Sequence, residues 1–447
     1  MEHGFIWGAA SAAFQMEGAS REDGKGLSIW DVMLHEPGRA KRGDTGDVAC
    51  DHYHRWREDV HLMAELGIGA YRFSIAWSRI LPEGTGKVNE AGIAFYSNLV
   101  DALLENGIQP YVTLYHWDLP EALFLRGGWM NPESPEWFYR YAKLVGERLG
   151  GRVKHFITLN EPNNTIEGMT PGGANAPGLG YSLRERLAAL HNLLKAHGRA
   201  VQALRETVPD VQIGFAPCCA VPCPADDRPE TVRAAKDLFF SSQAGNLTRD
   251  FPVVTLYSDP VFLGDYPREY YDFYARNLRP EITKEDLRII SEPTDVCFHN
   301  IYSGEIVRTD EQGAAAVVPW TGPRNMLGWP VIPQTLYWGP KFLWERYGKP
   351  IMITENGYPA TDCMSLDGAV HDPGRIDFIR RYTGELARAR RDGADIRGYF
   401  YWCIMDNLEW ELGFEPRFGL IHVDFDTLVR TPKDSYAFYR ELVKKPL

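Results

Sequence analysis

Two stretches of the sequence place a glutamate directly after a short apolar run. Residues 155–162, HFITLNEP, reach Glu161 just before a proline, and residues 349–357, KPIMITENG, reach Glu355 just before Asn-Gly. One carboxylate at the end of a strand is usually solvated or paired with a cation. Two of them in the same pattern, each next to an asparagine and a turn-forming residue, favour a site that uses a pair of carboxylates.

A pair of carboxylates can break a glycosidic bond. One carboxyl group protonates the leaving oxygen, and the other either attacks the sugar or activates a water molecule. A gap of about 5 Å between the groups gives retention of configuration, and one of about 6.5 to 9.5 Å gives inversion. The sequence does not fix this gap, so the residues alone leave both outcomes open.

Arg72 supports the same chemistry. It lies inside the apolar stretch AYRFSIAW, where a guanidinium group is rarely found without an anion nearby. An arginine beside one carboxylate would keep it ionised, while repulsion between the carboxylates would raise the pKa of the other. The alternative is a structural salt bridge beneath the site.

Eight apolar runs rich in β-branched and aromatic residues have the pattern of buried strands. They lie at residues 4–10, 69–77, 107–117, 153–162, 211–217, 294–304, 349–357 and 395–407. Helical periodicity separates them, for example over 89–108 and over 134–151, where Ser134 is expected as the N-cap. The fold class is therefore predicted as α/β, a single (β/α)8 TIM barrel that takes in residues 1–447 as one catalytic domain.

In such a barrel the active site lies at the carboxyl ends of the strands, where both glutamates fall. Three Gly/Pro-rich segments, residues 168–181, 217–230 and 309–338, are too long for tight turns and are expected to be long loops at this face.

The overall composition narrows the class of partner. The net charge of −12 argues against nucleic acid and anionic membranes, and favours a neutral or cationic small molecule. The seven cysteines lack zinc-site spacing and are expected to be reduced, and His52 and His54 are expected to pack on a helix. With no long apolar run and no leader-like pattern at the start, the expected location is the cytoplasm.

Six segments, in order along the chain, closely resemble the motifs of glycoside hydrolase family 1, the retaining β-glucosidases and their relatives. They are FIWGAASAAFQMEGA, YRFSIAWSRI, YVTLYHWDLP, TLNEP, ITENG and GYFYWCIMDNLEW with RFGLIHVDF after it. The resemblance implies a (β/α)8 barrel, no metal or organic cofactor, and double displacement. It makes Glu161 the general acid/base and Glu355 the nucleophile, with support from Asn160, Arg72, Tyr302 and Asn300.

The resemblance also implies a set of sugar-binding residues. Gln15, His116, Trp117, Glu409 and Trp410 would bind the hydroxyls of the non-reducing sugar, and Trp402 would lie beneath its ring. Trp329 would stack on the leaving-group side, and Phe418 is a further expected substrate-binding residue. Taken alone, His116 would more often be a structural histidine, and its YHWDLP context favours binding. Glu409 would repel a phosphate, so an unphosphorylated glycoside is favoured.

The expected function is that of an exo-acting β-glucosidase that cleaves cellobiose and small or aryl β-glucosides, in keeping with a role in cellulose degradation. β-Galactosidase or β-fucosidase side activity and transglycosylation remain open, as does the oligomeric state. The alternative from another class is a catalytically silent sugar-binding barrel.

Overall fold

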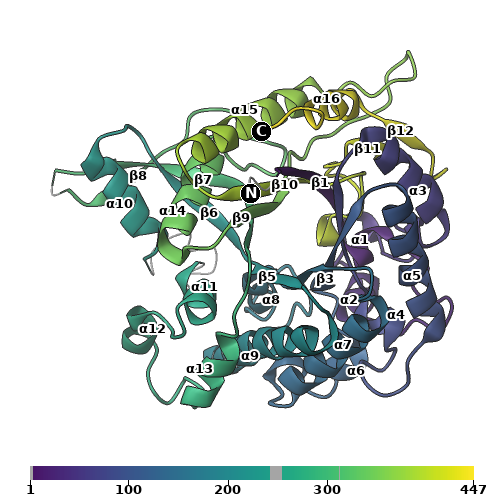
Figure 1. Ribbon diagram of the computed structural model, residues 1–447, viewed down its shortest axis with the longest axis horizontal. Helices are drawn as coiled ribbons and strands as arrows, with labels where there is room; N and C mark the ends of the chain where they lie inside the picture. The colour runs from purple at the N-terminus through teal and green to yellow at the C-terminus, as the bar shows by residue number, and fades with distance from the viewer. Residues whose placement is uncertain (1–3, 242–253, 312) are drawn as a thin grey trace.

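The computed structural model describes residues 4–241, 254–311 and 313–447 (Figure 1). Each of the eight predicted segments contains a β-strand, so the prediction is confirmed at every one. The strands are β1 (Ile6–Ala10), β2 (Ala70–Ser74), β3 (Gln109–Tyr115), β4 (His155–Asn160), β5 (Gln212–Ala216), β7 (Cys297–Thr309), β9 (Ile351–Asn356) and β10 (Ile396–Trp402).

The strands form one parallel sheet in the order β5-β4-β3-β2-β1-β10-β9-β7-β6. The fifth barrel position is shared by β5 and β6 (Cys218–Pro224), which Pro217 separates. β5 pairs with β4, whereas β6 pairs with β7, beginning at Cys218 opposite Asn300. Asn300 donates its backbone N–H to the carbonyl oxygen of Pro217 at 3.0 Å. The sheet therefore curls round as the (β/α)8 barrel that the sequence predicts.

Helices surround the strands in Figure 1. The longer ones are α3 (His52–Leu66), α5 (Glu90–Glu105), α7 (Ser134–Leu149), α9 (Leu183–Thr207), α10 (Pro229–Phe239), α14 (Thr335–Tyr347), α15 (Pro373–Arg391) and α16 (Asp434–Leu442). Shorter helices are α1 (Ala13–Met16), α2 (Ile29–His35), α4 (Trp77–Ile80), α6 (Glu121–Phe124), α8 (Pro162–Glu167), α11 (Thr255–Phe262), α12 (Arg268–Phe273) and α13 (Lys284–Ile290). Single 3-10 turns are η1 (Lys41–Gly43), η2 (Gly128–Met130) and η3 (Trp410–Leu412).

Two expectations about local structure are wrong. The N-cap of α7 is Glu133, one residue before Ser134, and its side chain makes no capping hydrogen bond. Segment 217–230 is not a loop, because it contains β6 and the start of α10. The prolines of β6 make its sequence look like a loop. They are tolerated because β6 is the last strand in the sheet order, so one of its edges needs no hydrogen bonds to a neighbouring strand.

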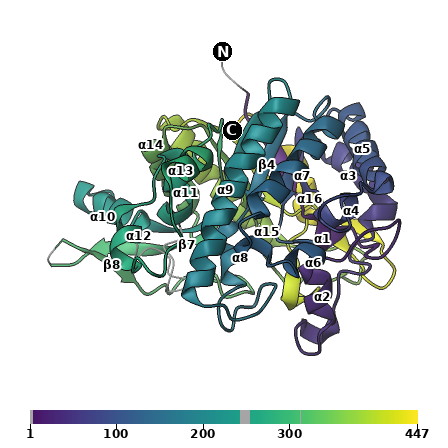
Figure 2. The same cartoon turned by 90° about the horizontal axis from the view of Figure 1, so that it is seen from below.

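Segment 309–338 also departs from the expected loop. It contains β8 (Ala315–Val318), which pairs antiparallel with the outer half of β7, and it runs into α14. This hairpin projects from the body of the barrel beside α10 (Figures 1 and 2). Residues 168–181 hold no helix or strand, as predicted. A further pair of short strands, β11 (Ile421–Val423) and β12 (Arg430–Pro432), follows the barrel.

The barrel interior is packed with side chains. Tyr111, Ile157, Met352 and Phe400 form part of one buried cluster inside it. Phe298 fills the space above Gly214, where an added Cβ would lie 2.6 Å from the Phe298 ring. A filled interior confines ligand binding to the end of the barrel. No helix in the described ranges is long and apolar enough to cross a membrane.

Candidate active site

Both glutamates lie at the carboxyl end of a barrel strand. β4 ends at Asn160, and Glu161 follows in a left-handed backbone conformation, with φ of 43°, before Pro162 opens α8. Glu355 is the penultimate residue of β9. Their side chains are buried, with exposed fractions of 5% and 3%. Because a left-handed φ is uncommon outside glycine, the sharp turn at Glu161 is a strained feature of the kind found at functional sites.

A hydrogen-bonded bridge joins the two carboxyl groups. Arg72 donates from Nη1 to Glu355 Oε1 at 2.5 Å and from Nη2 to Asn160 Oδ1 at 2.6 Å. Asn300 Nδ2 donates to the same Asn160 oxygen at 3.0 Å and to Glu161 Oε1 at 2.7 Å. The structure thus brings together residues of β2, β4, β7 and β9 that the sequence had placed separately.

Arg72 lies in the site itself. Its guanidinium group is fully buried, and its remaining contacts are to Thr113 Oγ1 and to the backbone carbonyl of Thr354. Because this fork of donors contacts both Glu355 and Asn160, the alternative of a salt bridge beneath the site does not describe it.

Glu355 has donors on both of its oxygens. Tyr302 donates its hydroxyl to Oε2 at 2.7 Å, while Arg72 occupies Oε1. Burial raises the pKa of Glu355, and the charge of Arg72 and the hydroxyl of Tyr302 oppose that rise. These two donors stabilise the ionised carboxylate, which is the form a nucleophile needs.

Glu161 has a different environment. Its second oxygen accepts a hydrogen bond from Asn164 Nδ2 at 2.6 Å. Burial, reinforced by the negative charge of Glu355, raises the pKa of Glu161 to about 8. The donors on Glu355 therefore favour its ionised form, whereas the surroundings of Glu161 favour its protonated form. Sequence reasoning missed Asn164, although its position one helical turn after Glu161 was a usable signal.

The two carboxyl groups open into a cleft of about 700 Å³. Its size is typical of a small-molecule site. Ten residues expected in the site line it, namely His116, Trp117, Glu161, Tyr302, Trp329, Glu355, Trp402, Glu409, Trp410 and Phe418. The other four, Gln15, Arg72, Asn160 and Asn300, contact these lining residues from behind.

Aromatic rings form one wall of the cleft. The ring of His116 stacks at 5.8 Å from those of both Trp402 and Trp410, and Trp117 lies 4.5 Å from Trp410. Trp117 donates its indole N–H to the backbone carbonyl of Asn160. Trp117 and Trp410 both have left-handed backbones, with φ of 76° and 50°, so this wall is held in a strained local geometry.

Two polar atoms beside this wall are buried without a partner in the described structure. Asn160 Nδ2 donates to His116 Nε2, which places the proton of neutral His116 on Nδ1, and that N–H is unpaired. Gln15 uses its amide N–H groups on Leu408 and Glu409, and its Oε1 is unpaired. Leaving buried polar atoms unpaired is costly, so a free donor and a free acceptor side by side are suited to a ligand rich in hydroxyl groups.

The surroundings of Glu409 also favour its neutral form. Burial raises its pKa to about 8, with smaller contributions from Glu411, Glu355 and Glu161. The expectation that Glu409 repels phosphate by its own charge therefore needs a different physical basis. Burial inside an acidic cluster disfavours an anion there whichever carboxyl holds the proton.

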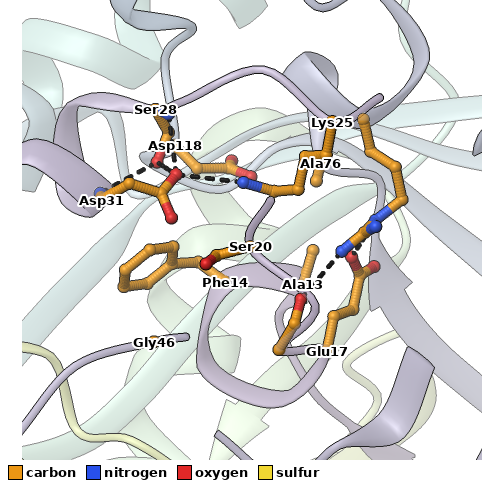
Figure 3. A pocket seen from close by; sticks show the side chains of 12 residues that line it. Ala13, Phe14, Glu17, Ser20, Lys25, Ser28, Asp31, Gly46, Ala76 and Asp118 are labelled. Atoms are coloured by element: carbon orange, nitrogen blue, oxygen red, sulfur yellow. Dashed lines mark hydrogen bonds and ion pairs between the residues drawn. The ribbon is translucent and has the colours of Figure 1, made fainter. Parts of the chain in front are cut away.

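A second, much smaller cavity lies beside Phe14, whose ring stacks on that of Trp410 at 5.9 Å (Figure 3). Its volume of about 10 Å³ is that of roughly one water molecule, too small for a sugar. Lys25 donates to Asp31 at 3.0 Å across it, and the carboxyl of Asp118, next in the chain to Trp117, faces it. Asp118 Oδ1 is buried without a partner within the described residues, and burial raises the Asp118 pKa well above its usual value.

The remaining histidine and cysteine candidates differ in their surroundings, because Cys218 and Cys219 line the cleft, whereas His54 is exposed and paired with Asp51 and Glu22. His52 bonds to Asp59 at 2.7 Å inside the protein, and the cysteines are free thiols, of which Cys363 is exposed. Within the described residues, no group of three or more His, Cys, Asp or Glu side chains is arranged to hold a metal ion.

Comparison with known proteins gives consistent matches over nearly the whole chain. A family model for glycosyl hydrolase family 1 matches residues 1–446. The chain is 45% identical to beta-glucosidase A of Thermotoga maritima over 444 residues, which covers 99% of this chain and 97% of that protein. It is 43% identical to a 1,4-beta-D-glucan glucohydrolase of Thermotoga neapolitana, with the same coverage. The solved structure of the Thermotoga maritima beta-glucosidase in complex with glucoimidazole superposes with a TM-score of 0.89 at 44% identity, covering 99% of this chain and 98% of that one.

Proposed function

The chain belongs to glycosyl hydrolase family 1 and is a β-glucosidase, and on this premise we propose that it removes terminal, non-reducing β-D-glucosyl residues with retention of configuration. The observation that carries the proposal is the unequal state of the two glutamates. Burial raises the pKa of Glu161 to about 8, whereas the Arg72 guanidinium group and the Tyr302 hydroxyl oppose the rise at Glu355 and favour its ionised form. That is the division of roles that double displacement requires.

In the first step the ionised Glu355 attacks the anomeric carbon, and Glu161 gives its proton to the departing oxygen. A glycosyl-enzyme ester forms as the glycosidic bond breaks. With its proton gone, Glu161 becomes the base. It takes a proton from the incoming water, whose oxygen attacks the anomeric carbon and releases Glu355 as a carboxylate.

We assign the binding roles from the geometry of the cleft. In this proposal Asn160, held by Arg72 and Asn300, bonds the hydroxyl next to the anomeric carbon, and the unpaired atoms of His116 and Gln15 bond hydroxyls further round the ring. The aromatic wall covers the C–H face of the pyranose. Trp329 lies on the leaving-group side, with its ring 5.5 Å from that of Tyr302.

The direct test is release of nitrophenol from a nitrophenyl β-glucoside. We expect Glu355→Ala and Glu161→Ala to lose most of this activity, and Glu147→Ala, a change on the outer helix α7, to retain it. Added azide then separates the roles. With Glu355→Ala the azide attacks directly, so the product is the α-glucosyl azide, whereas with Glu161→Ala the azide attacks the ester and the product is the β-glucosyl azide. The same anomer from both variants would refute the assignment.

Several finer points belong to the same proposal. Cellobiose and aryl glucosides are the expected substrates, and β-galactosides or β-fucosides are expected to be side substrates. A role in cellulose degradation and action in the cytoplasm are part of the proposal too. The barrel strands come from both ends of the chain, Ile6 to Trp402, which supports one catalytic domain over residues 1–447.

Transglycosylation is a second activity that one observation favours. The leaving-group side of the cleft has an apolar lining of Leu327, Trp329 and Phe418. Such a surface can hold an acceptor sugar against the ester in place of water. Product analysis at high acceptor concentration tests this, and glucose as the only product would exclude it.

A further inference from the structure

The cleft continues well past the leaving-group position. Residues Tyr302 to Glu305 of β7 line it in succession, and Val317 and Val318 of β8 extend the same wall. Val318 pairs with Ile306, so the wall runs at least four strand residues, about 13 Å, beyond Tyr302. A pyranose has only three bonds of about 1.5 Å between its C1 and C4 atoms. The wall is therefore longer than a single leaving-group sugar needs.

Trp320 lies at the outer part of this wall, just after β8, and lines the cleft. Two contacts fix its ring. Its indole N–H donates to the backbone carbonyl of Pro323 at 2.9 Å, and Gly322 packs so closely on it that an added Cβ would lie 2.4 Å from Trp320 Cζ2. The indole group has no other hydrogen to donate, so what the ring offers to the cleft is apolar surface.

The segment that carries Trp320 also carries Trp329, and it is held by its own backbone and side chains. Arg324 and Pro330 form an isolated bridge, and Arg324 Nη1 donates to the carbonyl of Gly328 at 2.7 Å. Asn325 Oδ1 accepts from the backbone N–H groups of Leu327 and Trp329. The two tryptophans thus belong to one cross-linked segment, in which Trp329 packs near Tyr302 and Trp320 follows β8.

We propose that Trp320 forms a second sugar-binding position on the leaving-group side, which holds the third ring of a β-linked glucooligosaccharide. The inference rests on the proposed glucosidase function and names a substrate class for the same cleft. Trp329 receives the ring next to the cleaved bond, and Trp320 receives the ring after it through its C–H face. The exposed Val317, half of whose surface is accessible, adds apolar surface beside that ring.

The test compares cellotriose with nitrophenyl β-glucoside, which lacks the outer rings. We expect Trp320→Ala to lower the ratio of their kcat/KM values, triose over aryl glucoside, about two- to tenfold, the range of a lost aromatic contact. The matched control is Trp344→Ala, which removes a partly buried tryptophan of α14 that does not line the cleft. We expect it to leave the ratio unchanged. Trp320→Phe keeps an aromatic face and should retain most of the ratio.

Binding provides an independent readout. In a Glu355→Gln background, which cannot turn substrate over, calorimetry should show that Trp320→Ala weakens cellotriose binding two- to tenfold and cellobiose binding by a smaller factor. The proposal would be overturned if Trp320→Ala left both the kcat/KM ratio and cellotriose binding unchanged. It would also be overturned if Trp320→Ala weakened cellotriose and cellobiose binding by the same factor. Loss of the proposed function would look different, because the unmodified protein would then fail to cleave the aryl glucoside at all.

Discussion

Removal of the Arg72 guanidinium group should change the pH at which the enzyme becomes active. Arg72 is buried, and it donates to Glu355 Oε1 at 2.5 Å while also holding Asn160. In Arg72→Met the ionised Glu355 keeps the neutral donors Tyr302 and Asn300 and loses the positive charge of Arg72. An adjacent arginine commonly lowers a carboxyl pKa by about one to three units, and this contribution would be lost.

The direction of the effect follows from the role of Glu355. The acidic limb of the kcat/KM profile reports protonation of the nucleophile in the free enzyme. Because loss of a positive neighbour raises the pKa of Glu355, the acidic limb should move toward neutral pH by about one to three units. The maximal rate should also fall by about 10²-fold or more, since a buried charge left without its partner costs about 3 to 5 kcal/mol.

The assay is the initial rate on nitrophenyl β-glucoside across the pH range in which the variant remains folded. Arg72→Lys is the matched control. It keeps a positive charge but cannot bond Glu355 and Asn160 at once, so the rate should fall while the acidic limb moves less than in Arg72→Met. An acidic limb that stays in place in Arg72→Met would show that Arg72 does not set the charge of Glu355.

Three further changes test other parts of the structure. Glu161→Gln should abolish the alkaline limb of the kcat/KM profile, because that limb reports loss of the Glu161 proton, whose pKa is raised to about 8. Lys433→Met should lower the free energy of unfolding by about 1 to 3 kcal/mol, measured by urea titration, because Asp362 and Asp406 would lose a shared buried cation and keep Arg375 and Arg417 as cationic partners. Asp118→Asn should change the free energy of unfolding by less than about 1 kcal/mol, because burial already favours the neutral form of this carboxyl.

Each of these has its own control. Glu167→Gln, at the end of α8, is the control and should keep the alkaline limb of the kcat/KM profile. If Glu161→Gln kept that limb as well, another group would have to supply the proton. Lys444→Met removes an exposed lysine and is the control for Lys433→Met. An equal decrease in the free energy of unfolding in both variants would contradict a stabilising role for the buried ion pairs of Lys433. The control for Asp118→Asn is Asp118→Glu. A large decrease in the free energy of unfolding in Asp118→Asn, with none in Asp118→Glu, would show that the charged form is needed.

The local pattern of the sequence was enough to predict the barrel and to place two glutamates at the same end of it. Strand composition and helical periodicity are local properties, and in a parallel barrel the carboxyl end of every strand reaches the same face. Glu161 and Glu355 could therefore be placed in one site although they are far apart in the chain. The family motifs added the sugar-binding residues, which the structure gathers around one cleft.

Other features depend on contacts that no local pattern encodes. β6 was hidden by its prolines, because only its position at the end of the sheet makes them acceptable. Asn164 and Trp320 line the site only because the chain turns sharply at Glu161 and returns over the cleft after β8. The different tendencies of Glu161 and Glu355 to hold a proton also depend on the tertiary structure, since burial and the Arg72–Asn160–Asn300 bridge exist only when four strands are assembled. The sequence determined which residues could do the chemistry, and the packing around them determined which one holds the proton, because a pKa is set by neighbours in space.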